Sequence, residues 1–292
     1  MKIYQNLFLS LIFMLLLVGL AACGTIPAGK FQALESAGDQ IQTTSADTFL
    51  RIENLQRLIY VIRANKLTEI GRDTFSVPKD LDLSPDLKYR AQKIETMVSY
   101  LRLLNSLASK DFASDVDKAS QDLAASTQTL LATAGQKADE AKQVAGIFGT
   151  VIDAVARAAV TKLRRDILRE SMQKGQPGID ALAKTFQGSS KLLQQAVATY
   201  KDNYLVHVNA TRPKTLNWQL NQIDSEIANR MSEFNAVVDS LQGIEGAIGK
   251  IPAAHREVLH ALDDPTKASD ELKALLAEAK RIRGFYKNLT KN

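Results

Sequence analysis

Cysteine, proline and glycine are all scarce in this sequence, and each scarcity excludes a class of structure. The single cysteine, Cys23, rules out an intramolecular disulfide framework and any zinc site built from several cysteines. Seven prolines and fifteen glycines in 292 residues are too few for a loop-rich all-β protein, which needs many tight turns. Apolar residues make up 45% of the chain and charged residues 24%, and this globular balance also excludes wholesale disorder.

Histidine is equally rare, and the usual signs of catalysis are missing with it. His255 and His260 are five residues apart, so on a helix they would not share a face as a metal-binding pair does. The strings typical of zinc proteases, serine hydrolases and phosphate-binding loops do not occur. The carboxylates are spread close to lysine or arginine, as in solvated ion pairs. We therefore predict that the protein is not an enzyme and has no catalytic residues, no metal site and no bound cofactor.

Apolar residues recur at three- and four-residue steps along most of the chain after residue 30, which predicts helices. Long helices of this kind are stable only when they bury their apolar stripes in one another. We therefore predict an all-α fold: an elongated antiparallel bundle of five to seven helices, with coiled-coil-like long helices, in one domain over residues 31–292. The expected helices cover residues 31–65, 85–109, 115–172, 179–209, 216–248, 255–262 and 269–288.

Several short motifs set these boundaries. Ser84 before Pro85 is a strong helix start, and Ser114 resembles a capping residue for the helix from 115. Gly135 is a point where that long helix could kink, and Gly146 and Gly149 are further ones. The string from Gly175 to Gly178, with Pro177 inside it, is typical of a turn, and Pro252 should interrupt the heptad-like helix before it.

The N-terminus has the layout of an export signal. After Lys2 an apolar run reaches Leu20, and it is shorter than the roughly 20 apolar residues that a membrane-spanning helix needs. The four residues Leu20, Ala21, Ala22 and Cys23 then resemble the lipobox of bacterial lipoproteins.

This resemblance implies that residues 1–22 are a signal peptide that is cleaved off. Cys23 would then be the first mature residue, carrying a diacylglycerol and an N-acyl chain, and residues 23–30 would be a short tether. Gly24 stands where an aspartate would favour the inner membrane, so the resemblance implies the outer membrane, facing the periplasm. It covers only this segment and names no activity.

The segment Val144–Val160 is the most apolar part of the chain after the signal region. It suits a helix buried against neighbours on two sides, and this is the interpretation that we favour. The alternative is a membrane-inserting tip, as in helical pore-forming toxins, but Asp153 and Arg157 lie near its middle and would be costly in a bilayer.

Basic residues gather in two places, and at both they suit either ordinary helix ends or contact with an anionic lipid or cell-wall surface. The residues that could make such contact are Lys162, Arg164, Arg165, Arg169, Lys280, Arg281, Arg283 and Lys287.

The sequence thus predicts a lipid-anchored protein of the bacterial cell envelope that acts as a non-enzymatic helical interaction or scaffold module. Its expected partners are the lipid bilayer, through the acyl chains, and a protein of the envelope; nucleic acid is not expected at an exported address. A pore-forming protein using 144–160 and an immunity or exclusion lipoprotein are the alternatives. The oligomeric state stays open.

Overall fold

The computed structural model describes residues 26–68, 84–109, 112–158, 163–211, 217–267 and 269–289. Within these ranges the chain forms seven α-helices and one short 3₁₀ helix, and no strand, which confirms the predicted all-α fold. The elements are α2 (Ala28–Thr68), α3 (Pro85–Ala108), α4 (Phe112–Thr133), η1 (Gly135–Lys137), α5 (Ala138–Ala158), α6 (Arg164–Thr211), α7 (Asn217–Ala261) and α8 (Asp270–Leu289). The predicted signal peptide and Cys23 lie outside the described residues, so the structure does not test them.

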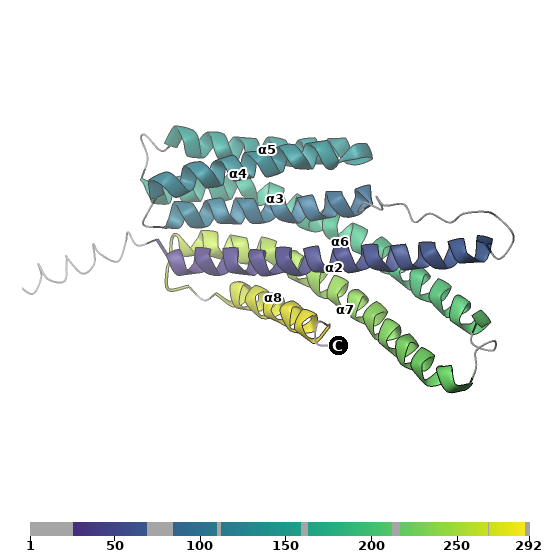
Figure 1. Ribbon diagram of the computed structural model, residues 1–292. Helices are drawn as coiled ribbons and strands as arrows, with labels where there is room; N and C mark the ends of the chain where they lie inside the picture. Colours follow the sequence, from purple (N-terminus) through teal and green to yellow (C-terminus); the bar gives the residue numbers. More distant parts are fainter. Residues whose placement is uncertain are drawn as a thin grey trace, which may run out of the picture.

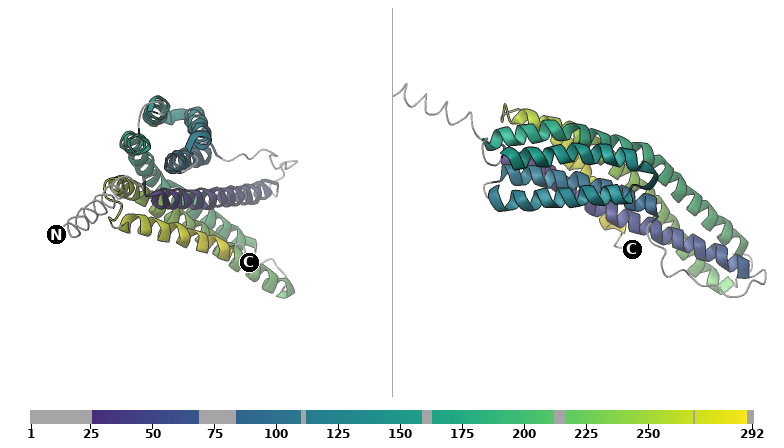
Figure 2. Two further views of the ribbon diagram at one scale, coloured as in Figure 1. Left: turned by 90° about the vertical axis from the view of Figure 1, so that its left-hand side faces the viewer. Right: turned by 90° about the horizontal axis from the view of Figure 1, so that it is seen from above.

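The helices pack along a common long direction, and successive helices run in opposite senses (Figure 1). Helices α3, α4, α5 and α6 contact one another in cyclic order, as in a four-helix bundle. On the other side, α2, α7 and α8 pack together, and α2 and α7 both contact α6 (Figure 2). The long helix α6 is therefore shared by both groups, which produces the elongated bundle.

Helix α3 is enclosed on three sides, where α2, α4 and α6 pack against it. Sixteen of its 24 residues are buried, including charged ones. Lys93 lies inside with its Nζ 2.5 Å from Glu140 of α5 and 3.0 Å from the hydroxyl of Thr185 on α6. Such pairing is the condition under which a charge is tolerated in a core.

The helix start predicted at Ser84 is confirmed, since its hydroxyl oxygen accepts a hydrogen bond from the Leu87 backbone N–H at 3.3 Å. The start predicted at Ser114 is wrong, because α4 already begins at Phe112. The single helix predicted over 115–172 is wrong, because the segment divides twice. One break is at Gly135, whose φ of 52° lies in the left-handed region that glycine adopts without strain, and the other lies between the end of α5 at Ala158 and the start of α6 at Arg164. Gly146 and Gly149 do not interrupt α5.

The turn predicted at Gly175–Gly178 is also wrong, because α6 runs through it from Arg164 to Thr211. Both glycines are buried where other helices approach: a side chain at Gly175 would overlap the Tyr100 ring, and one at Gly178 would lie 3.0 Å from Phe148 Cζ. Pro177 is exposed, and so is Gln173, whose carbonyl loses its usual helix partner to the proline. Water can hydrate that carbonyl, so the helix continues.

Helix α7 likewise runs through Pro252 to Ala261, so the predicted interruption there is wrong. The heptad-like series that precedes it is largely confirmed as a core seam. Phe234, Val237, Leu241 and Ile248 are buried, and Ile227 is half-buried against the core.

Three helices extend well beyond the others at the end opposite the first described residues (Figure 1). We call this extension the arm and define it as residues 52–68 of α2, 192–211 of α6 and 217–238 of α7. Its interior is apolar, with Ile59 of α2, Val197 of α6 and Phe234 of α7 all buried. The aromatic rings of Tyr204 and Phe234 lie 6.0 Å apart between α6 and α7.

Candidate functional site

Three arginines of the basic group at residues 162–169 contact the ends of other helices: Arg164, Arg165 and Arg169. Arg164 Nη1 donates to the Ser109 carbonyl at 2.6 Å, and Arg164 Nη2 to the Ala108 carbonyl at 3.4 Å, so Arg164 caps the C-terminus of α3. Arg165 donates to the Leu262 carbonyl just after the end of α7, and Arg169 pairs with Asp263. Cations at helix C-termini complement the macrodipole. Of the two interpretations of this group, the geometry favours the structural one; Lys162 lies outside the described residues.

The basic residues at 280–287 lie in α8 and have different surroundings. Arg281 forms a local ion pair, and Arg283 lines a groove. Arg281 pairs with Glu278 one turn earlier on α8, with Nε 3.2 Å from Oε1. Lys280 and Arg283 are exposed, and the side chain of Lys287 lies outside the described set. Lys280 and Arg283 are three residues apart on α8, so contact of this group with an anionic surface stays a prediction.

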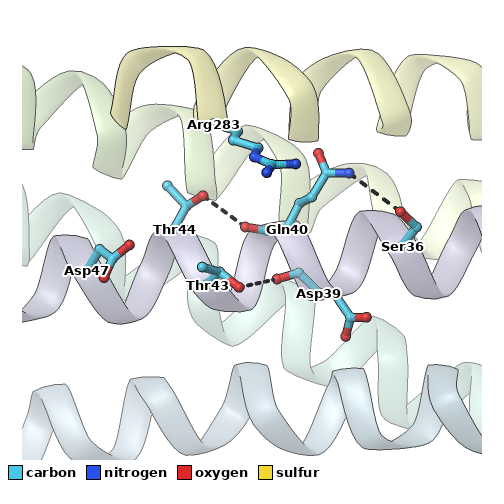
Figure 3. Close-up of a pocket in the computed structure, with 7 residues that line it drawn as sticks. All are labelled: Ser36, Asp39, Gln40, Thr43, Thr44, Asp47 and Arg283. Atoms are coloured by element: carbon cyan, nitrogen blue, oxygen red, sulfur yellow. Dashed lines mark hydrogen bonds between the residues drawn. The ribbon is translucent and has the colours of Figure 1, made fainter. Parts of the chain in front are cut away.

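Arg283 borders a polar groove of about 420 Å³ between α2 and α8 (Figure 3). Thr43 and Thr44 use their hydroxyls on their own helix, donating to the carbonyls of Asp39 and Gln40 at 2.9 and 2.8 Å. The Asp39 carboxylate pairs with Arg102 of α3 at 2.8 Å. Because Asp39 and Asp47 both line the groove with Arg283, the groove offers an anion two negative charges against one positive. It is lined by Ser36, Asp39, Gln40, Thr43, Thr44, Asp47 and Arg283.

The apolar segment 144–160 lies mostly in α5, which packs on α4 and α6. Val144, Phe148, Val151 and Val155 are buried, whereas Asp153 and Arg157 are exposed to solvent on the outer face. Residues 159 and 160 lie outside the described ranges. The segment is thus an amphipathic helix whose apolar face belongs to the core, as the favoured interpretation expected.

A buried polar network that the sequence analysis missed joins three helices at the centre of the bundle. His255 of α7 is fully buried, with Nε2 2.8 Å from Tyr100 Oη of α3 and Nδ1 2.7 Å from Gln176 Oε1 of α6. Gln176 Nε2 donates to the Asp180 carboxylate at 2.9 Å, which fixes the orientation of the amide. Since an amide oxygen only accepts, His255 carries its proton on Nδ1 and accepts from Tyr100 at Nε2.

Electrostatics keep this histidine neutral. Burial lowers the pKa of the His255 imidazole to about 3, with a further contribution from the charge of Arg256. Arg256 itself pairs with Asp180 at 3.0 Å, at the solvent-facing edge of the network. Burial also raises the pKa of the Tyr100 hydroxyl well above its usual value. A neutral, fully enclosed pair of this kind holds α3, α6 and α7 in register and has no access to a substrate.

The only sequence signals of this network were Gly175 and His255. A buried glycine beside a tyrosine marks a close approach of two helices, but nothing local to either residue names the partner. Both partners of the Tyr100 hydroxyl are distant in sequence. The Ser171 carbonyl, 3.3 Å from this hydroxyl, is 71 residues away along the chain, and His255 is 155 residues away.

Large apolar side chains are exposed in the arm and elsewhere among the described residues. Leu192 is 65% exposed and Val206 59% exposed on α6, Leu50 and Tyr60 are exposed on α2, and Leu131 of α4 and Leu163, just before α6, are exposed outside the arm. Leu192 also lines a groove of about 270 Å³ beside the N-terminus of α3.

Two further observations complete the geometry. None of the helices in the described ranges combines the length and hydropathy that crossing a bilayer requires. Among the same residues, no three side chains of His, Cys, Asp or Glu are grouped so as to hold a metal ion. Comparisons of the chain with protein-family models, with curated proteins and with solved structures find no match.

Proposed function

We propose that the protein is a lipid-anchored, non-enzymatic interaction module of the bacterial cell envelope, which is held at its N-terminal end and presents the arm to a protein partner. The observation that carries the proposal is the placement of the two ends. The first described residues and the arm lie at opposite ends of the bundle (Figure 1). An anchor at Cys23 would therefore hold the arm at a distance from the membrane.

The tether would be short. Ile26 packs against the core, so only Gly24 and Thr25 separate Cys23 from the first residue that contacts the folded bundle. An extended chain covers about 3.5 Å per residue, so the N-terminal end of the bundle would lie within roughly 10–15 Å of the lipid surface. Helix α6 alone, with 48 residues, is about 70 Å long. Reach is therefore supplied by rigid helices and not by a flexible linker.

The exposed apolar residues of the arm support a role in binding protein. Leu192 and Val206 lie outside the core, although the opposite face of α6 already buries Leu193, Val197 and Tyr204. Apolar side chains that the fold itself does not use are candidates for a partner surface.

Two experiments test the proposal in bacterial cells. Radiolabelled palmitate should enter the wild-type protein and not a Cys23→Ser variant. A photo-crosslinking residue placed at Val206 should capture a protein, whereas the same residue at Gln128, exposed on α4 of the body, should not. Absence of label from the wild type would refute the anchor, and equal capture at both positions would refute the arm as the interaction surface.

The pore-forming alternative requires a larger rearrangement. Val144, Phe148 and Val151 would have to leave their contacts with α4 and α6 before they could enter a bilayer. We therefore expect no dye release from liposomes at micromolar protein. An immunity or exclusion lipoprotein differs from our proposal only in the identity of the partner.

A further inference from the structure

All seven described helices begin or end at or near the end of the bundle where the chain enters α2 (Figure 1). Hydrogen bonds connect several of these helix ends. Lys30 Nζ donates to the Lys267 carbonyl at 2.9 Å, which joins the start of α2 to the turn between α7 and α8. Arg164 and Arg165, at the start of α6, bind carbonyls at the ends of α3 and α7. We call this end the base; it consists of residues 26–30, 108–109, 163–169 and 262–267.

One large apolar side chain of the base lies in solvent. Leu163 is 76% exposed, more than any other large apolar residue that the structure describes. Its backbone is nevertheless held, because its carbonyl accepts hydrogen bonds from the backbone N–H groups of Asp166 at 2.9 Å and Ile167 at 3.2 Å. The fold thus fixes the position of Leu163 without burying its side chain, which remains able to enter an apolar medium outside the protein.

The proposed anchor determines which medium the base would face. Only Gly24 and Thr25 separate Cys23 from Ile26, which packs against the core. So short a tether would keep the base within roughly 10–15 Å of the lipid and leave it little freedom to turn away. At that distance an apolar side chain is stabilised by entering the boundary between headgroups and acyl chains, as the apolar faces of interfacial helices do.

The carboxylates closest to Leu163 in the base are paired with a cation. Asp166 lies 3.4 Å from Arg169, and Asp263 pairs with the same arginine. The outer flank of α4 is less suited to a lipid surface, because it exposes three aspartates and one lysine, and anionic lipids repel the carboxylates. These residues are Asp115, Asp117, Asp122 and Lys118.

From the short tether and the exposed leucine we propose that the base is a lipid-binding surface, on which Leu163 enters the headgroup layer and the bundle stands upright on the membrane. The inference rests on the proposed function, because it takes the acyl chains on Cys23 as given, and it adds the orientation of the molecule. Val206 lies 42 residues after Arg164 on α6. In an upright bundle this part of the arm is therefore held about 60 Å from the lipid.

Fluorescent labelling of the full lipidated protein tests this contact. Acylation converts the only native thiol, that of Cys23, to a thioether, so an introduced cysteine is the one reactive thiol. The protein is reconstituted in vesicles of phosphatidylethanolamine and phosphatidylglycerol that contain spin-labelled lipids. These lipids should quench a fluorophore at Leu163→Cys at least about twofold more than one at Leu131→Cys, because only Leu163 reaches the headgroup layer. Leu131 is the matched control, an exposed leucine near the opposite end of α4.

Flotation with the vesicles, measured on the same samples, separates the failure of this inference from the failure of the anchor. Protein that floats with equal quenching at Leu163→Cys and Leu131→Cys would overturn this inference and leave the anchor in place, whereas protein that does not float would overturn both. A third label at Lys280→Cys, exposed on α8, reports a bundle that lies on its flank. Quenching at Lys280→Cys as strong as at Leu163→Cys would overturn the upright orientation.

Discussion

At the scale of single residues, the centre of the bundle depends on the absence of a side chain at Gly175. The Tyr100 ring occupies the space that a Cβ would fill, and its hydroxyl is held by His255. The same ring lies 5.1 Å from the ring of Phe148 and 5.6 Å from that of His255, between centroids. One glycine therefore determines how closely α6 approaches α3.

A pair of glycine substitutions measures this effect. Gly175→Ala should lower the free energy of unfolding by about 1–3 kcal/mol, because the added methyl group overpacks a site whose neighbour cannot move away. Gly146→Ala, at an exposed position of α5 with no neighbouring atom within 4 Å, should raise it by about 0.5–1 kcal/mol through helix propensity. Urea unfolding followed by circular dichroism gives both values. Equal effects at the two positions would contradict the close approach.

His255 makes stability depend on pH in a defined direction. Its pKa is about 3 in the folded protein and 6.5 ordinarily, so between these values only the unfolded state binds the proton. The free energy of unfolding should therefore fall as the pH falls through this window, by about 3 kcal/mol from pH 6.5 to 4. A His255→Gln variant lacks this contribution, so its stability should fall less over the same range. Parallel stability curves for the two proteins would refute the buried neutral histidine.

At the scale of elements, helix ends are stabilised by residues distant in sequence. The Ser109 carbonyl at the end of α3 accepts a hydrogen bond from Arg164, which lies 55 residues later in the chain. The Leu262 carbonyl accepts one from Arg165, which lies 97 residues earlier. The basic character of residues 162–169 was evident from the sequence, but the carbonyl partners were not, because they come from other helices.

Removing one of these caps should therefore affect folding. Arg164→Ala should lower the free energy of unfolding by about 1–3 kcal/mol, since it leaves two carbonyls without a charged donor. Lys280→Ala, at an exposed position of α8, should change it by less than about 0.5 kcal/mol. Thermal unfolding of both variants checks the difference. If Arg164→Ala leaves stability unchanged and weakens binding to anionic vesicles, the surface interpretation replaces the structural one.

At the scale of the whole molecule, the body and the arm differ in how many helices surround each segment. Helix α3 is enclosed by three neighbours, whereas α6 in the arm contacts α2 and α7 and leaves Leu192 and Val206 exposed. Segments with fewer buried contacts open at a lower free-energy cost.

Hydrogen exchange should reveal this difference directly. Peptides from 193–208 of α6 should exchange faster than peptides from 94–107 of α3, by at least tenfold in the free chain with Cys23→Ser. Equal protection of the two segments would contradict the division into body and arm.

The sequence by itself determined the fold class and most helix positions, because helical periodicity and caps such as Ser84 with Pro85 act over a few residues. It also predicted the buried faces of α5 and α7, since an apolar stripe must be covered by something. Only the tertiary structure decided that Gly175–Gly178 is helix rather than turn, because packing of Tyr100 and Phe148 on the two glycines outweighs the local preference for a turn. It also decided the roles of His255 and Arg164, since their partners come from other helices and local sequence carries no record of which surfaces will meet.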